Sequence, residues 1–160
     1  MIVAESTEGI FRISASATVV EEILENTMRD ESFNGEKYRV HEVAGAFKKY
    51  LREAEPIIPI PIITKMFKAH SGVSVDKEKL WELVESFPSV TKGILSVLIP
   101  FIHSIAALKT VNLMSIDNLA IIFSPILLND NSTVLDLGKT GTQVDIMEQL
   151  IRLSEVRLDR

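Results

Sequence analysis

The chain has 160 residues, with 17 basic against 22 acidic side chains for a net charge of −5, and 46% of its residues are apolar. A chain of this length can bury a core without help from a disulfide or metal, so we expect one globular domain. The absence of cysteine excludes a disulfide scaffold, a thiolate nucleophile and Cys-ligated metal sites. The acidic excess argues against nucleic acid as a partner, because affinity for phosphate backbones comes from clustered Lys and Arg.

No segment of the sequence indicates a membrane. The first residues, MIVAESTEG, lack the basic and apolar regions of a signal peptide. The longest uncharged apolar stretch, residues 93–108, is shorter than the ~20 residues that a membrane span needs, and Pro100 and His103 interrupt it. We therefore expect a buried core helix there, no insertion into a membrane, and a cytoplasmic protein.

Helical periodicity dominates the first half of the chain. Apolar residues recur at three- and four-residue steps over residues 16–29 and again over 41–54, with the polar loop 31–39 between them. The prolines of IIPIPI predict an extended connector that leads into a short helix over 62–70.

The second half also predicts helices. Asp76 is expected to cap a helix that ends near Phe87, and a long apolar helix follows over residues 89–110, kinked or broken at Pro100. Ser115 is expected to cap a short helix that Pro125 ends, and Thr142 with Asp145 to open a last helix to about residue 157. Between them lies a polar loop, 129–141, in which only Val134–Leu137 is strand-like. The predicted fold is all-α: a single-domain bundle of about seven to nine helices.

The sequence supports neither of two common enzyme signatures. The three histidines are far apart and no HExxH motif occurs, so no metal site is predicted. Gly138-Lys139-Thr140 mimics the end of a phosphate-binding P-loop, but Thr133 stands where that loop needs another glycine. An enzyme that hydrolyses nucleotides in its own right is therefore a remote alternative.

The segment TEGIFRIS, residues 7–14, places Arg12 between Phe11 and Ile13 in a run too short for a helix. Apolar neighbours on both sides of the cation would make a rigid loop that presents an arginine outward. A plain surface ion pair is the simpler alternative, and from this segment alone it is favoured.

Two helices carry further candidates. Lys48 and Arg52 lie four residues apart, a like-charge spacing that destabilises an isolated helix, so we expect an anionic or carbonyl-rich group to face them. The predicted helix 115–124 has a core stripe and also, on its other side, Asn118, Ile121 and Ile122, which lead to Pro125. Full burial and a partner groove are equally open explanations for this second side.

Three motifs, TEGIFRIS, KKYLREAEPIIP and NLMSIDNLAIIFSPIL, occur in this order. Together they resemble the RhoGAP domain, the all-helical module that activates Rho-family small GTPases. The resemblance runs from about Thr7 to Leu127 and implies a RhoGAP-like domain over residues 1–160. Because the chain starts almost at the first motif, the family's first helix is expected to be truncated or divergent.

The resemblance assigns roles to individual residues. It makes Arg12 the catalytic arginine finger, and places Lys48 and Arg52 on the lysine and arginine of the K-x-x-L-R motif. Asn118 falls on the asparagine of the N-L-A motif and, with Ile121, Ile122 and Pro125, would line the groove for the GTPase. The chain departs from the usual pattern at Ala54 and Ile126, where a leucine-proline and an asparagine are common.

The resemblance also implies a mode of action. The protein would be a regulator, not itself an enzyme, and would act as a monomer on a Rho- or Rac-family GTPase in its GTP-bound form. It would need no cofactor of its own, because the partner carries GTP and magnesium. The alternatives are a catalytically weak RhoGAP-like module that binds GTPases as a scaffold or effector, and an activator of another GTPase family.

Overall fold

The computed structural model describes residues 2–29, 34–131 and 137–157. Over these ranges the protein is built from α-helices and one short 3₁₀ helix, η1, and contains no β-strand, which confirms the all-α prediction. In chain order the elements are α1 (Ile2–Glu5), α2 (Ala17–Met28), η1 (Gly35–Lys37), α3 (Val40–Glu53), α4 (Ile60–Lys68), α5 (Lys77–Glu85), α6 (Ser89–Ala107), α7 (Lys109–Asn112), α8 (Ile116–Leu127) and α9 (Leu137–Arg157).

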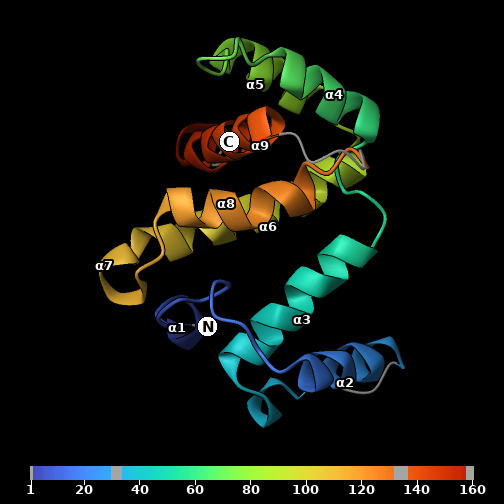
Figure 1. Cartoon of the computed structure of the whole chain (residues 1–160), viewed down its shortest axis with the longest axis vertical. Helices are drawn as coiled ribbons and strands as arrows, with labels where there is room; N and C mark the ends of the chain where they lie inside the picture. Colours follow the sequence, from blue (N-terminus) through green and yellow to red (C-terminus); the bar gives the residue numbers. More distant parts are fainter. Residues whose placement is uncertain (1, 30–33, 132–136, 158–160) are drawn as a thin grey trace.

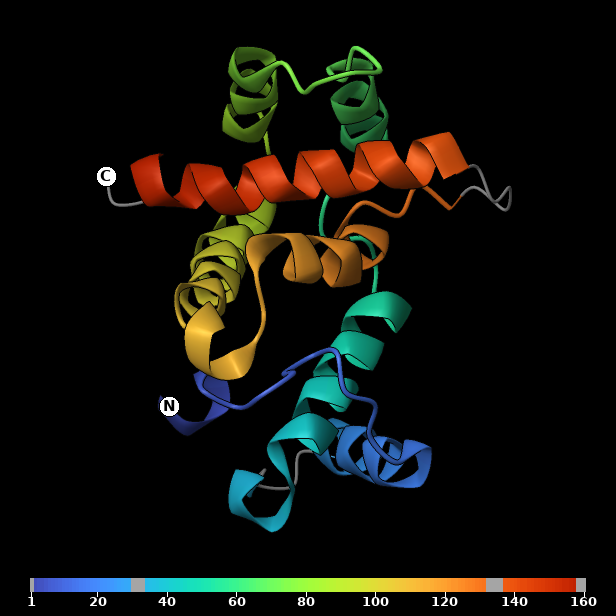
Figure 2. The same ribbon diagram turned by 60° about the vertical axis from the view of Figure 1, so that its left-hand side comes forward.

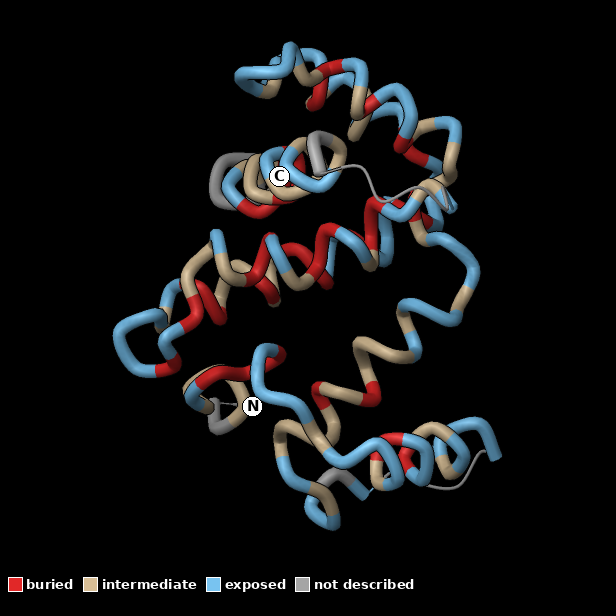
Figure 3. The backbone as a smooth tube through the Cα atoms, viewed as in Figure 1, coloured by how far each residue is buried: buried red, intermediate tan, exposed pale blue. Residues whose placement is uncertain are grey.

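Three long helices, α6, α8 and α9, form the centre of the molecule (Figure 1). Helix α9 crosses the molecule, with α4 and α5 on one side of it and α6 and α8 on the other (Figure 2). Buried residues are concentrated where α8 meets α6 and α9 (Figure 3). The side chains of Ile102, Leu119, Phe123, Ile146 and Ile151 are fully buried there.

Helices α2 and α3 form a separate layer at the other end from α4 and α5 (Figure 2). A small second core of Val20, Ile23 and Ala46 joins this pair. Helix α3 also packs on α8, and the first loop of the chain lies between α1 and α2 (Figure 1). This arrangement brings the first predicted motif close to the second.

Helix α6 begins four residues before the uncharged stretch 93–108 and, over Ser89–Ala107, is long and apolar enough by length and composition alone to cross a membrane. The same features are typical of a core helix, and seven of its residues are buried against the rest of the protein. The helix is also continuous through Pro100, so no break forms there. Proline removes one hydrogen bond, to the carbonyl four residues earlier, and burial of α6 outweighs that loss.

The prediction that Pro125 ends its helix is wrong, because α8 continues to Leu127. Pro125 has no N–H and so cannot donate to the carbonyl of Ile121, four residues earlier. Burial of Leu127 and Leu128 after the proline stabilises the extra turn. Ser115, in contrast, caps α8 as predicted, accepting a hydrogen bond from the amide of Asn118 at 3.2 Å.

The last helix begins at Leu137, and not at Thr142 as predicted. The strand-like residues 134–136 lie outside the described residues, and Leu137 is helical. The predicted cap of α5 is confirmed, since Asp76 accepts a hydrogen bond from the amide of Lys79 at 3.1 Å. The predicted long helix to residue 110 is instead α6 followed by the single turn α7.

Candidate functional site

The loop that carries Arg12, residues 6–13, has an unusual backbone. Gly9 and Phe11 both adopt left-handed conformations, with φ of 64° and 66°. The carbonyl of Gly9 accepts hydrogen bonds from the amides of Arg12 and Ile13, both at 2.9 Å, which folds the loop back on itself. A side chain at Gly9 would be strained at this φ and its Cβ would lie 2.7 Å from Ile13 Cδ1, so this turn favours glycine. We call residues 6–13 the finger loop.

Phe11 anchors the finger loop in the core. Its side chain is 3% exposed, and its ring lies 5.0 Å from that of Phe123, with Phe47 and Phe101 at 6.2 and 6.3 Å between centroids. A left-handed conformation at a residue other than glycine costs about 1–3 kcal/mol and persists only where its surroundings enforce it. The aromatic cluster supplies that enforcement, since burying the ring offsets the strain.

Arg12 follows this anchor directly and has the opposite exposure. Its side chain is exposed, and within the described residues it has neither a hydrogen-bond partner nor an ion-pair partner. The simpler alternative, an ion pair of Arg12 with a surface carboxylate, therefore does not occur among the described residues. A guanidinium on a fixed backbone, without a partner of its own, can form bidentate hydrogen bonds to an anion supplied by another molecule.

Lys48 on α3 supports the finger loop from the side. Its Nζ donates a hydrogen bond to the carbonyl of Phe11, so the carbonyl expected to face this residue belongs to the loop itself. Burial lowers the pKa of Lys48, and the nearby charge of Arg52 lowers it further. The neighbouring Lys49 points elsewhere, to Glu21 at 2.5 Å and Glu53 at 3.1 Å.

Arg52 does not contact the finger loop. Its side chain is exposed one turn beyond Lys48 and makes no hydrogen bond or ion pair to any described residue. The charge of Arg52 is thus available on the surface, on the same helix that braces the loop.

The four candidate residues on α8 differ in how far they are exposed to solvent. Ile121 is 59% exposed and Pro125 is also exposed, whereas Asn118 and Ile122 are half-buried. The Nδ2 of Asn118 donates to the carbonyl of Leu113 at 3.3 Å, which ties the helix to the loop before it. Full burial of this side is excluded, and an exposed apolar strip remains for a partner.

One residue of the site was missed by sequence reasoning. Asn112 is fully buried at the end of α7, and its carbonyl accepts a hydrogen bond from the amide of Gly9 at 2.8 Å. Its side chain bonds three further backbone groups. The only signal in the sequence is a polar residue between Val111 and Leu113, which local patterns do not connect to residue 9.

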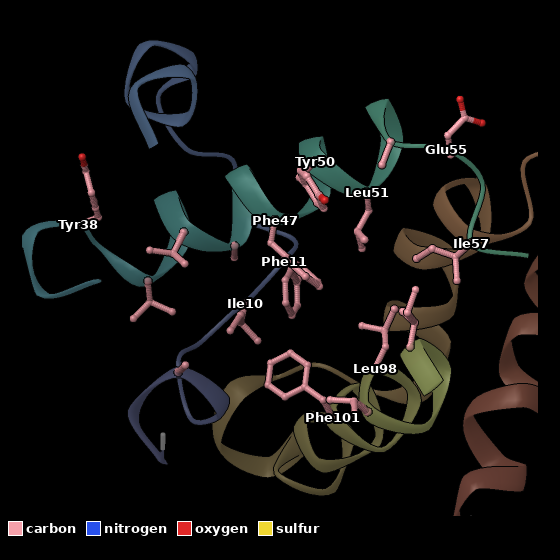
Figure 4. A pocket seen from close by; sticks show the side chains of 17 residues that line it. Ile10, Phe11, Tyr38, Phe47, Tyr50, Leu51, Glu55, Ile57, Leu98 and Phe101 are labelled. Atoms are coloured by element: carbon pink, nitrogen blue, oxygen red, sulfur yellow. The ribbon is translucent and has the colours of Figure 1, made fainter. Parts of the chain in front are cut away.

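A hydrophobic groove of about 1020 Å³ lies between α3 and α6, beside the finger loop (Figure 4). Ile10, Phe11, Phe47 and Phe101 point into it, and the polar residues that line it are Tyr38, Tyr50 and Glu55. No lysine or arginine lines the groove. A phosphate needs cationic or N–H donors, so this groove is not suited to a nucleotide.

The segment that mimics a P-loop is also occupied by other contacts. Lys139 forms an ion pair with Asp130 at 2.5 Å, and its ammonium lies 5.5 Å from the ring centroid of Phe67. Residues 137–140 are already helical. This lysine holds the start of α9 in place, and the segment cannot wrap around a phosphate in this conformation.

The RhoGAP domain family matches residues 3–132 of the chain. Rho GTPase-activating protein gacEE of Dictyostelium discoideum is 31% identical over 150 residues, covering 90% of this chain and 24% of that protein. Rho GTPase-activating protein 35 of Canis lupus familiaris is 29% identical over 154 residues, covering 92% of this chain and 10% of that protein. The chain thus spans about a quarter or less of the length of these relatives.

Solved structures show the same fold. The BH domain from Graf, the GTPase regulator associated with focal adhesion kinase, superposes with a TM-score of 0.84 at 24% identity, over 98% of this chain and 86% of that one. Human Rho GTPase activating protein 15 superposes with a TM-score of 0.83 at 27% identity, over 96% of this chain and 75% of that one. With four-fifths of its sequence matched by the family and its fold shared with these structures, the chain belongs to the RhoGAP domain family.

Proposed function

We propose that this domain accelerates GTP hydrolysis by Rho- and Rac-family small GTPases, by inserting Arg12 into the nucleotide site of the partner. The observation that carries the proposal is the state of Arg12. An exposed arginine without a described partner follows directly on a buried, strained and doubly anchored backbone. Membership in the RhoGAP family and the names of its relatives supply the class of partner.

The chemistry explains why an arginine would serve. In the transition state of GTP hydrolysis, negative charge is spread over the oxygens of the γ-phosphoryl group. A guanidinium keeps its charge when it is desolvated and presents fixed donors to two oxygens at once. Arginines supplied in this way raise the rate of a GTPase about 10³–10⁵-fold, which corresponds to about 4–7 kcal/mol.

The surrounding residues would order the finger loop and bind the GTPase. Lys48 holds the carbonyl next to Arg12, so the finger enters the partner with its backbone already ordered. Arg52, exposed on the same helix, would bind carbonyls or carboxylates of the switch regions. Asn118, Ile121, Ile122 and Pro125 would form the surface against which the switch segments pack, and the finger loop would hold the glutamine that positions the attacking water.

The proposal extends to what the protein needs and where it acts. It would act as a monomer on the GTP-bound form of its partner, with no cofactor of its own, because the GTPase carries the nucleotide and magnesium. We propose residues 1–160 as one RhoGAP-like domain in the cytoplasm. It would act without insertion into a membrane.

Single-turnover hydrolysis of GTP by a panel of Rho- and Rac-like GTPases tests the proposal, with wild-type protein, Arg12→Ala or no addition. Wild type is expected to accelerate at least one GTPase about 10³-fold or more, and Arg12→Ala to lose most of this while binding the GTP-loaded partner as before. The variant Lys65→Ala, an exposed cation on α4, is the matched control and should behave as wild type.

The other outcomes are equally informative. If wild type binds GTP-loaded partners without accelerating any of them, the domain is a binding module and the proposed activity is wrong. If Arg12→Ala accelerates as well as wild type, a different residue is the finger. Hydrolysis of GTP by the protein alone would instead indicate an enzyme in its own right.

A further inference from the structure

Asn112 is bonded through every polar group of its side chain. Its Nδ2 donates to the carbonyl of Glu5 and to that of Ile105, both at 2.7 Å, and its Oδ1 accepts from the amide of Met114 at 2.8 Å. A carboxamide has two N–H donors and one carbonyl oxygen, so one residue satisfies three backbone groups. Asn112 is 0% exposed, and none of these bonds competes with water.

These three backbone groups belong to three different elements. Glu5 ends α1, Ile105 lies in the last turn of α6, and Met114 precedes α8. The last carbonyls of a helix lack an amide donor four residues further along the helix. Asn112 supplies a donor to the carbonyl of Glu5 and a second one to that of Ile105, which also accepts from the amide of Leu108 at 3.1 Å. The side chain of Asn112 thus joins the end of α1, the end of α6 and the approach to α8 at one buried point.

The main chain of Asn112 extends this junction into the finger loop. Its carbonyl accepts the amide of Gly9 at 2.8 Å, three residues before Arg12. Lys48 holds the carbonyl of Phe11 on the other side. The stretch between Gly9 and Phe11 is therefore fixed at both ends, to the α7–α8 connection by Asn112 and to α3 by Lys48.

We infer that Asn112 is a positioning residue for Arg12. It sets the finger loop against the approach to α8, so that Arg12 and the exposed strip of α8 meet one partner in a fixed relative geometry. Asn112 is buried and touches no partner itself, and it acts through the backbone of the loop. The inference rests on the proposed function, since it assigns a role within the same site.

If Asn112 positions Arg12, removing its side chain should lower the rate of GTP hydrolysis but not the affinity for the GTPase. Without the side chain of Asn112, its main-chain bond to Gly9 remains but is no longer tied to the ends of α1 and α6 and to the approach to α8, so Arg12 can be displaced. A displacement of about 1 Å can lower a catalysed rate about 100-fold. The strip on α8 keeps its own packing, because Leu119 and Phe123 remain buried beneath it. The rate at saturating concentration should therefore fall about 10–100-fold in Asn112→Ala, while binding to the GTP-loaded partner changes little.

A double-mutant cycle with Arg12→Ala distinguishes positioning from general support of the fold. If Asn112 acts through Arg12, Asn112→Ala has no further effect on the rate once Arg12 is absent. The matched control is Thr91→Val, which removes another buried hydrogen bond, from Thr91 Oγ1 to the carbonyl of Ile57 at 2.8 Å, away from the finger loop. It should lower the unfolding temperature without lowering the saturated rate.

A second variant and a second measurement complete the test. Asn112→Ser keeps a shorter polar side chain, whose hydroxyl can donate and accept, and is measured beside Asn112→Ala in case the alanine variant does not fold. Amide hydrogen exchange of Gly9, Arg12 and Ile13 in the free protein gives a measurement that does not depend on a GTPase. Exchange at these amides should be faster in the Asn112 variants and unchanged in Thr91→Val.

Equal rate losses with and without Arg12, or unchanged exchange at Gly9 in a folded Asn112 variant, would overturn the positioning role. Absence of acceleration by the wild-type protein would overturn the proposed function instead. The two failures are therefore distinguishable, because the exchange measurement concerns the loop alone.

Discussion

The finger loop and the start of α9 each contain a cation that the sequence made a candidate for phosphate chemistry. The two cations differ in which of their groups, side chain or backbone, is bound by the rest of the protein. At the start of α9 the side chain is engaged: Lys139 pairs with Asp130 and lies over Phe67. In the finger loop the backbone is engaged: Asn112 and Lys48 hold it, and Arg12 itself contacts no described partner.

This contrast indicates which cationic side chains are available to bind an anion of another molecule. A cation already paired within its own chain has lost much of its attraction for an external anion. A cation without a partner on a mobile chain would have to be ordered on binding, which opposes association. Arg12 avoids both losses, because the fold satisfies the loop's backbone and leaves the guanidinium open.

The largest effect that this comparison predicts is on stability, in the aromatic anchors of the two regions. Phe11→Ala should lower the free energy of unfolding by about 3–5 kcal/mol, as expected for a fully buried aromatic ring in contact with three others. Phe67→Ala should lower it by roughly 1–2 kcal/mol, because that ring is only partly buried. Denaturant unfolding measures both.

The same pair separates the two regions by activity. At a temperature where both variants are folded, Phe11→Ala should lose most of the acceleration of GTP hydrolysis and Phe67→Ala should keep it. Equal activity of the two variants would show that the strained backbone at Phe11 does not matter for the finger.

A smaller effect, on the rate of GTP hydrolysis, is predicted for exchanges between arginine and lysine in the two regions. Arg12→Lys keeps the charge but not the planar fork, so at least one charge-assisted hydrogen bond to the phosphoryl oxygens is lost. Such a bond contributes about 1.5–3 kcal/mol, so the single-turnover rate should fall about 10–100-fold. Lys139→Arg, the matched exchange at the start of α9, should leave the rate unchanged, and a loss there equal to that of Arg12→Lys would refute the contrast.

The smallest predicted effect is on the pH profile. Burial, with the charge of Arg52, holds the pKa of Lys48 below the ordinary lysine value of 10.5. As the pH rises through this lowered pKa, Lys48 loses the charge that strengthens its hydrogen bond to Phe11, and the acceleration should decline before pH 10.5 is reached. Lys48→Arg stays charged, so its decline should move to higher pH.

Lys49→Arg is the control for the pH profile. The hydrogen bond to Glu21 raises the pKa of Lys49, so this residue does not titrate in the range where Lys48 does. Its replacement should leave the alkaline decline where it is in wild type. If Lys48→Arg leaves the decline there too, a group of the GTPase sets it.

Much of the fold could be predicted from the sequence because its signals are local. Apolar periodicity located the long helices, and Asp76 and Ser115 cap the helices that they were expected to cap. The errors arose where tertiary packing overrides a local signal. Pro125 lies inside a continuous helix, and α6 is not broken at Pro100, because the buried residues around the two prolines stabilise these helices more than the prolines disrupt them.

The candidate site could be predicted only where local sequence patterns mark it. The like-charge spacing of Lys48 and Arg52 indicated that a carbonyl faces this helix, and one faces Lys48. The anchor of the loop could not be found in this way, because Asn112 bonds the carbonyl of Glu5 across 107 positions of the chain. The left-handed Phe11 was equally hidden, since rings from three other segments hold it.

The most direct test of the central claim, that Arg12 is presented for the transition state and not for ground-state binding, is a comparison of affinities. The affinity of the protein for its GTPase is measured with a non-hydrolysable GTP analogue and with GDP plus a fluoride mimic of the transferring phosphoryl group. Wild type should prefer the mimic, and Arg12→Ala should bind the analogue as wild type does but lose that preference. A preference for the mimic that survives in Arg12→Ala would contradict the account.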